Sequence, residues 1–182
     1  MPRTAILIGL CLNLLLAALP AVQAPSKAPN YVIQLTTGQK IPLNTHAGKV
    51  VFLLFVNTDC PHCGEACKIA QRLQDDYGLR GFQALGIAFD QRARQDLPGF
   101  IKRSGARFPI GFDTAVALLN FIQRPPGIVH VPILVVIDRA GYIRGQYFGD
   151  HELLAKDPER NLRALAEKLL QESPGRSPKL RF

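Results

Sequence analysis

The pattern of apolar and polar positions changes its period once in the first half of the chain. Residues 49–56 form an apolar run with turn or polar residues on either side, and such a run is typical of a strand buried on both faces of a sheet. From Pro61 onward, apolar residues recur at three- and four-residue spacing as far as Tyr77, and Gly78 stops the pattern. This spacing predicts a helix that ends at a glycine. The sequence therefore predicts a buried strand that leads directly into a helix.

The rest of the chain repeats these two kinds of pattern. Two short segments, 31–35 and 40–43, flank a glycine-containing turn and predict a hairpin. Downstream we expect, in order, a strand at 82–89, a helix at 96–104, an extended piece at 108–112, a helix from Ala115 capped by Asp113, a strand at 132–137, a turn at 138–141, a strand at 142–148 and a helix that opens at Asp157-Pro158. This order predicts an α/β fold in which helices flank a central mixed β-sheet. The N-terminal β-hairpin and a βα insertion are additions to that sheet.

The N-terminus carries the pattern of an export signal. Arg3 is followed by an apolar stretch at 5–19, and Val22-Gln23-Ala24 is a small-residue cleavage pattern. We expect a signal peptide at 1–24, a linker at 25–30, one folded domain at 31–171 and a basic tail at 172–182. An uncleaved membrane anchor is the alternative, although the unbroken apolar part is shorter than the roughly 20 residues that a spanning helix needs.

Composition narrows the class of protein. The chain has 182 residues, of which 47% are hydrophobic and 20% charged, and this fits one globular domain. The formal net charge is +8, but the basic residues form no run interleaved with aromatic residues, so we expect no nucleic-acid partner. Three cysteines, Cys60, Cys63 and Cys67, crowd together. Structural disulfides of exported proteins usually join distant segments, so this crowding indicates chemistry.

The segment Cys60-Pro61-His62-Cys63 lies at the predicted strand-to-helix junction. Two cysteines one helical turn apart can bridge, and the free amides and positive dipole at the start of a helix stabilise a thiolate on Cys60. We assign Cys60 as the nucleophile that forms a mixed disulfide and Cys63 as the thiol that resolves it. Pro61 suits the first helical turn, and His62 adds a donor that favours the thiolate and raises the reduction potential. A structural disulfide or half of a zinc site is the alternative, but no second pair of ligands follows.

These motifs resemble the thioredoxin superfamily, and specifically its periplasmic TlpA-like branch. The resemblance rests on Gly48-Lys49, on the segment from Asp59 to Cys63, and on Val131-Pro132 followed by residues 135–141, and it spans residues 31–171. It implies a thioredoxin-like fold with a cis-proline at Pro132 that faces the dithiol. It further implies that Val131 and Pro132 line a substrate groove and offer backbone hydrogen bonds to an extended peptide. The working group would be a redox-active disulfide, with no other cofactor.

Two positions depart from the pattern of that family. Family members usually have Trp before the first cysteine, where this chain has Asp59. The cytochrome-maturation members have Glu three residues after the second cysteine, where this chain has Ala66, with Glu65 one place early. The Pro-His dipeptide is instead similar to that of strongly oxidising periplasmic thiol oxidases. The direction of electron flow therefore stays open.

Cys67 has no counterpart in the family pattern and supports a second hypothesis. It lies on the same helix face as Cys60 and Cys63, where it could pack as a small buried hydrophobe, exchange with the disulfide or bind metal. Together with His130, these thiols would make a soft ligand set that suits Cu(I). The set resembles that of the Sco-type copper chaperones, so a copper chaperone using Cys63, Cys67 and His130 is the alternative function. A peroxidase is not favoured, because the Thr or Ser that peroxiredoxins carry three residues before the reactive cysteine is replaced by Asn57.

The sequence as a whole predicts a thiol-disulfide oxidoreductase that is periplasmic or secreted after signal cleavage, or membrane-anchored if the N-terminus is kept. Its expected partners are exported cysteine-containing proteins and a membrane redox partner. We expect His46, His151, Asp90 and Asp150 to be solvated loop residues. No feature of the sequence indicates an oligomeric state.

Overall fold

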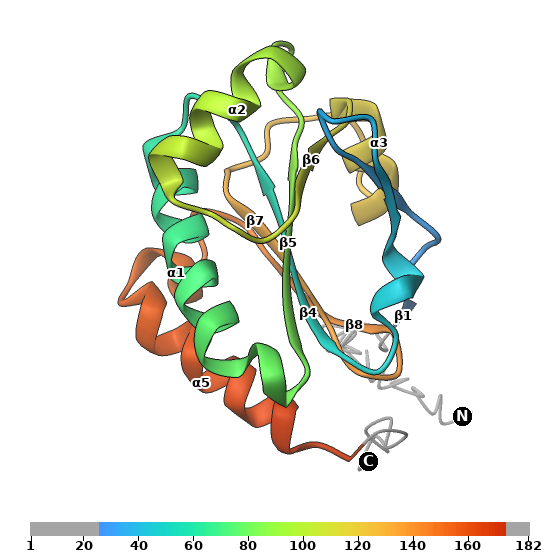
Figure 1. Cartoon of the computed structure of the whole chain (residues 1–182), viewed down its shortest axis with the longest axis vertical. Coiled ribbons are helices and arrows are strands. Elements are labelled where there is room, and N and C mark those ends of the chain that lie inside the picture. Colours follow the sequence, from blue (N-terminus) through green and yellow to red (C-terminus); the bar gives the residue numbers. More distant parts are fainter. Residues whose placement is uncertain (1–25, 174–182) are drawn as a thin grey trace, which may run out of the picture.

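The computed structural model describes residues 26–173 (Figure 1). The predicted signal peptide and nearly all of the predicted basic tail lie outside the described residues. Within residues 26–173, no helix is both long enough and apolar enough to cross a membrane. The described residues form one mixed sheet with helices on both faces, which confirms the expected α/β fold.

The sheet is built around the apolar run that the sequence places at its centre. Its strands in the described residues are β1 (Ser26–Lys27), β2 (Val32–Gln34), β3 (Lys40–Pro42), β4 (Val50–Val56), β5 (Phe82–Ala88), β6 (Ile110–Phe112), β7 (Ile133–Ile137) and β8 (Tyr142–Tyr147). Their order across the sheet is β1-β8-β7-β4-β5-β6-β2-β3. Strand β4 pairs in parallel with β5 and antiparallel with β7, and the hairpin β2–β3 joins the edge through β6.

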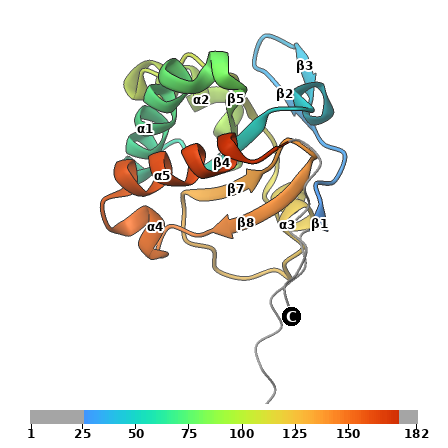
Figure 2. The same ribbon diagram turned by 90° about the horizontal axis from the view of Figure 1, so that it is seen from below.

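Helices cover the two faces of this sheet unequally. The described residues contain α1 (Pro61–Tyr77), α2 (Ala93–Ser104), α3 (Ala115–Ile122), α4 (Glu152–Ala155) and α5 (Pro158–Gln171), with short 3-10 helices at Leu43–His46 and Gly78–Arg80. Helices α1, α2 and α5 lie on one face and α3 on the other (Figures 1 and 2). The face with α1 therefore carries the larger helical layer.

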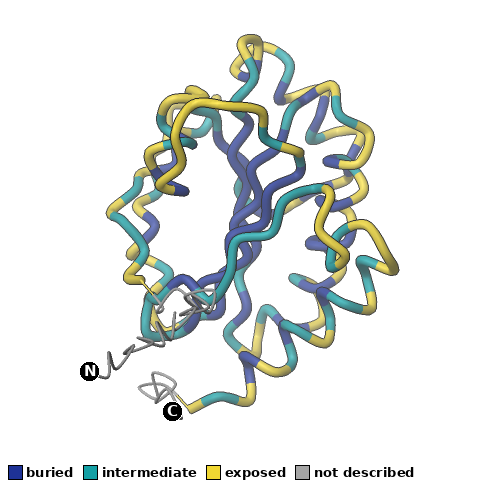
Figure 3. Tube along the Cα trace, turned by 180° about the vertical axis from the view of Figure 1, so that it is seen from behind, coloured by how far each residue is buried: buried dark blue, intermediate teal, exposed yellow. Residues whose placement is uncertain are grey.

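The core lies on both sides of β4, all of whose residues are buried (Figure 3). Phe52 and Leu54 face the layer of α1, α2 and α5, whereas Leu53 and Phe55 face α3. This alternation follows from the two-residue period of a strand. Each such buried side chain contributes about 1.5–3 kcal/mol relative to an exposed one. The carboxyl end of β4, which leads to the cysteines, is therefore held by packing on both faces.

Three local features differ from the sequence-based expectations. Residues 26–27, expected in a linker, form β1 and pair antiparallel with β8. Helix α3 is capped by Thr114, whose side chain accepts the amide of Ala117. Asp113, the expected cap, instead accepts a hydrogen bond from the hydroxyl of Tyr31. The short helix α4 was not expected, because it has too few residues to show a period.

Candidate active site

Cys60 lies at the N-cap of α1, directly after β4. Its backbone is extended, with φ −85° and ψ 116°, and Pro61 follows at the first helical position. The Sγ of Cys60 accepts a hydrogen bond from the backbone N–H of Cys63 at 3.2 Å, so sulfur takes the place that a Ser or Asp oxygen has in other helix caps. A negative sulfur accepts this bond more strongly than a neutral one, and the positive end of the helix dipole acts in the same sense. The geometry therefore places the Cys60 sulfur at the start of the helix, with one backbone donor directed at it.

The other two thiols lie beneath Cys60 in the core. Cys60 is half-buried, whereas Cys63 and Cys67 are buried, and all three are free thiols in the structure. Burial raises the pKa of Cys63, and its hydrogen bond with Cys60 adds to that shift. Burial also raises the pKa of Cys67 to about 12, with a smaller contribution from Cys60. Cys60 is therefore accessible to a substrate, whereas Cys63 is buried and protonated. An attacking and a resolving cysteine must differ in this way.

A hydrogen-bonded clamp fixes the loop that leads to Cys60. Thr58 is only 4% exposed, and the carboxylate of Asp90 accepts its backbone N–H at 2.8 Å and its hydroxyl at 3.1 Å. From the other side, the guanidinium of Arg103 donates to the Thr58 carbonyl at 2.9 Å. The backbone N–H of Cys60 then closes the turn on the carbonyl of Asn57 at 3.2 Å. The sequence missed Thr58 and Arg103, and it placed Asp90 on the solvated surface, whereas Asp90 is half-buried and holds this loop.

The segment expected to line the substrate groove precedes β7. The peptide bond between Val131 and Pro132 is cis, as the resemblance implies. Pro132 is buried, and the half-buried Val131 packs against the same core cluster as Cys60. Behind this segment, the backbone N–H of Gly149 donates to the carbonyl of His130 at 2.9 Å, and a Cβ at Gly149 would overlap the carbonyl of Val131. A glycine at 149 therefore allows the chain after β8 to support the cis-proline segment from close by.

The two histidines predicted for the site both lie at the surface. The side chains of His62 and His130 are exposed, and the hydrogen bond that the structure gives to the Cys60 sulfur comes from the backbone rather than from His62. Within residues 26–173, no group of three or more His, Cys, Asp or Glu side chains is placed to hold a metal ion. The structure thus does not bring His130, Cys63 and Cys67 together as the ligand set that the copper hypothesis requires.

The other polar loop residues have mixed surroundings. Asp150 and His151 are exposed, as expected, and His151 caps α4 by accepting the amide of Leu153 at 3.1 Å. His46 differs from the expectation because it is half-buried, and burial lowers the pKa of its imidazole. It lies on the 3-10 helix Leu43–His46, away from the cysteines in sequence and structure. None of these three residues lines the pocket beside Cys60.

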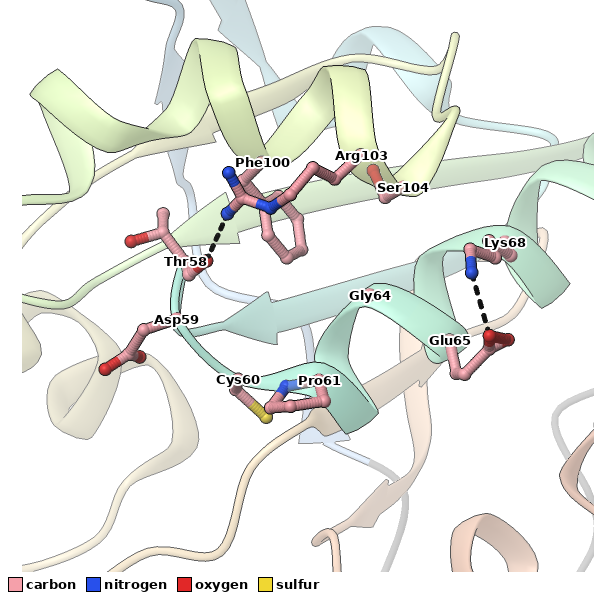
Figure 4. A pocket seen from close by; sticks show the side chains of 10 residues that line it. All are labelled: Thr58, Asp59, Cys60, Pro61, Gly64, Glu65, Lys68, Phe100, Arg103 and Ser104. Carbon is pink, nitrogen blue, oxygen red and sulfur yellow. Dashed lines mark hydrogen bonds and ion pairs between the residues drawn. The ribbon is translucent and has the colours of Figure 1, made fainter.

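A pocket of about 390 Å³ opens beside Cys60, between the first turns of α1 and helix α2 (Figure 4). Its lining residues are Thr58, Asp59, Cys60, Pro61, Gly64, Glu65, Lys68, Phe100, Arg103 and Ser104. Phe100 is 2% exposed and Ser104 3% exposed, so they form the floor. The reactive sulfur therefore has a concave surface on its α2 side that no sequence motif indicated.

Two thiols one helical turn apart, of which one is accessible, can alternate between a dithiol and a disulfide by exchange with a second disulfide. This chemistry and this sheet topology define the class: the protein is a thiol-disulfide oxidoreductase with a thioredoxin fold. Comparison with known families agrees, since residues 25–146 match the model of the AhpC/TSA family. The chain belongs to the AhpC/TSA family, and the resemblance to the thioredoxin superfamily is confirmed.

Individual relatives carry names that fit this class. The thiol-disulfide oxidoreductase ResA of Bacillus thuringiensis (strain Al Hakam) is 26% identical over 129 residues, which are 71% of this chain and 72% of the relative. ResA of Bacillus subtilis (strain 168) is 28% identical over 114 residues, 63% of each chain. A solved thiol:disulfide interchange protein of the thioredoxin family, from Chlorobium tepidum TLS, has a TM-score of 0.68 and 22% identity, and covers 82% of this chain and 99% of its own. That structural likeness shows the fold.

Proposed function

We propose that this thiol-disulfide oxidoreductase acts outside the cytoplasm on exported proteins that contain cysteine pairs. Cys60 attacks and Cys63 resolves. The observation that carries the proposal is the contrast between a half-exposed sulfur at the helix cap and a buried thiol one turn away. The export pattern at residues 1–24 supports the location.

The exchange proceeds in two balanced steps. The thiolate of Cys60 attacks one sulfur of a substrate disulfide, that S–S bond breaks, and the departing substrate thiolate takes up a proton. The Cys63 thiol then loses its proton and attacks the Cys60 sulfur, which releases the second substrate thiol and leaves a Cys60–Cys63 disulfide. Two electrons and two protons have moved to the substrate. The same steps in reverse oxidise a substrate dithiol, and a membrane redox partner would restore the starting state.

The cis-proline segment supplies the docking surface in this proposal. The backbone at Val131 would pair with an extended stretch of substrate beside Cys60, and Gly149 supports that backbone from behind. Hydrogen bonds between backbones select only weakly among substrate sequences, because every residue except proline offers the same N–H and C=O groups. Such a surface suits an enzyme with several protein substrates.

The location is tested with a reporter that folds only where disulfides form. The full chain, fused at its C-terminus to an alkaline phosphatase that requires disulfides, should be active in bacterial cells, and the same fusion without residues 1–24 should be inactive. Inactivity of both fusions, with both proteins present in equal amount, would remove the extracytoplasmic part of the proposal.

The substrate class is tested in the same cells with a trapping variant. Full-length Cys63→Ala should accumulate mixed disulfides, because the second step is blocked, and the double variant Cys60→Ala/Cys63→Ala should accumulate none. The proposal predicts that the trapped proteins carry export signals. Trapped proteins that lack export signals would contradict it.

A further inference from the structure

The pocket beside Cys60 has one cation placed to meet a ligand. Arg103 projects from α2 toward the loop before Cys60 (Figure 4). It uses one guanidinium nitrogen on the Thr58 carbonyl at 2.9 Å, which fixes the direction of the group. Within residues 26–173, no carboxylate forms an ion pair with Arg103. Since a guanidinium has five N–H donors, Arg103 has donors left for a bound molecule.

The other charged residues around the pocket do not neutralise the charge of Arg103. Lys68 and Glu65 pair with each other across one turn of α1 at 2.9 Å, so together they add little net charge. The carboxylate of Asp59 points away from Arg103 (Figure 4). Arg103 is exposed, so an ion pair that it makes with a ligand is a surface pair of modest strength. The pocket therefore presents a positive group above an apolar base, with Cys60 at its edge.

A second hollow of about 260 Å³ continues the surface along α2. It shares Thr58, Asp59 and Arg103 with the first pocket. Arg103 therefore lines both hollows. At the far end, Asp96 is already paired with Arg92 at 3.1 Å. Arg103 is thus the charged group best placed to select among substrates.

We propose that this pocket recognises an acidic side chain that lies next to the reactive cysteine of a substrate polypeptide, with Arg103 as the residue that binds its carboxylate. The inference rests on the proposed function and adds a specificity to it. A carboxylate matches the fork of guanidinium donors. The formal net charge of +8 would also speed the encounter with acidic partners at low salt.

The test compares matched disulfide peptides that differ at one position. Each peptide contains a single disulfide, with Glu, Gln or Lys next to one cysteine, and the fully reduced full-length protein is mixed with each at low salt. The wild-type protein should reduce the Glu peptide roughly fivefold faster than the Gln peptide, and the Lys peptide most slowly, as expected for one partly exposed ion pair. Salt at about 1 M should abolish the difference, because it screens the pair.

The variants assign this preference to Arg103. In Arg103→Gln the ratio of the Glu rate to the Gln rate should fall to about one, and Arg103→Lys should keep most of the preference. Lys102→Gln removes the same charge from the adjacent exposed position of α2, which does not line the pocket, and should leave the ratio unchanged. Asp59→Asn should increase the ratio, because it removes a negative charge from the lining of the pocket.

The outcomes separate the two proposals. Because each ratio is internal to one protein, a general loss of reactivity from a shifted Thr58 loop cancels. Equal rates for the three peptides in the wild-type protein, or a preference that Lys102→Gln abolishes as fully as Arg103→Gln, would overturn the inference while leaving the disulfide exchange intact. Failure to reduce any of the peptides would instead count against the proposed function.

Discussion

The loop clamp makes a strong prediction about Asp90, which lies 32 positions from Thr58 in the chain. Asp90→Ala removes the acceptor of two hydrogen bonds, at 2.8 and 3.1 Å, from a residue that is only 4% exposed. Hydrogen bonds to a charged group contribute about 1.5–3 kcal/mol each. Because Asp90 is itself half-buried and water can replace part of the loss, the lower end applies. We expect the free energy of unfolding to fall by about 3 kcal/mol.

Thr58→Val divides this loss between the two bonds. The substitution replaces only the hydroxyl, by a methyl group, so it should cost about 1.5 kcal/mol, and the remainder of the Asp90→Ala effect then belongs to the backbone N–H. The matched control is Asp76→Ala, which breaks a partly exposed pair with Arg163 of α5 at the far end of α1 and should cost below about 1 kcal/mol. Stability is measured by urea unfolding of the reduced proteins, followed by far-UV circular dichroism.

Asp90→Ala should also slow the disulfide exchange at Cys60. Without the hydrogen bonds of Asp90, the loop before Cys60 no longer keeps one backbone conformation. Because misplacement of the attacking sulfur raises the activation barrier, the rate of peptide disulfide reduction should fall about tenfold. The control Asp76→Ala should react at the wild-type rate, because Asp76 lies at the opposite end of α1 from Cys60. If Asp90→Ala unfolds at the same urea concentration as the control and reacts as fast, the clamp has no energetic role and the reasoning is refuted.

Three further predictions follow from burial and close contacts. The pKa of Cys67 is raised from 9.0 to about 12 in the folded state, so the folded protein keeps a proton that the unfolded chain releases above pH 9; the resulting stability is complete below pH 9 and lost as the pH rises toward 12. Between pH 9 and about pH 10, the free energy of unfolding should therefore fall by about 1 kcal/mol less in reduced Cys67→Ala than in the wild-type protein. This is measured by urea unfolding at each pH, and equal losses in the two proteins would contradict the assignment. Gly64→Ala should raise the free energy of unfolding by about 0.5–1 kcal/mol, and with it the melting temperature. A Cβ at this position meets no atom within 4 Å, and alanine favours the helix. Gly86→Ala should instead cost about 1–3 kcal/mol, because its Cβ would lie 2.9 Å from a buried isoleucine side chain; the same sign for both alanines would show that these contacts do not decide stability. Gly149→Ala should slow peptide reduction more than reaction with a small neutral disulfide, because its Cβ would displace the backbone of the cis-proline segment, and equal slowing of both reactions would remove that segment from substrate binding.

The parts of the fold that the sequence predicts well have a strong local period. Strand β4 and helix α1 are long, and their burial follows directly from the apolar run and the helical spacing. The position of Cys60 and Cys63 at their junction therefore follows from the local sequence pattern alone. By contrast, β1 contains only Ser26 and Lys27, which have no strand pattern, and it exists because β8 offers an edge.

The parts that could not be predicted depend on contacts between distant residues. Asp113 and Thr114 are both good cap residues in adjacent positions, and the structure decides between them because Asp113 is engaged by Tyr31, 82 positions away. Arg103 lies 45 positions from the Thr58 carbonyl that it holds. No local sequence pattern indicates that two such distant residues are in contact. Neither the clamp on Thr58 nor the pocket beside Cys60 could therefore be predicted from this single sequence.

The exchange by Cys60 and Cys63 is tested most directly by a single turnover, in which a disulfide peptide is mixed with an excess of the purified, fully reduced full-length protein or of one of three single variants. Cys60→Ser should show no turnover. Cys63→Ala should stop after one step with a mixed disulfide on Cys60, which mass spectrometry of the digested adduct locates. Cys67→Ala should turn over at nearly the wild-type rate. Turnover that persists in Cys60→Ser, or a peptide found attached to Cys67, would contradict the assignment of the pair.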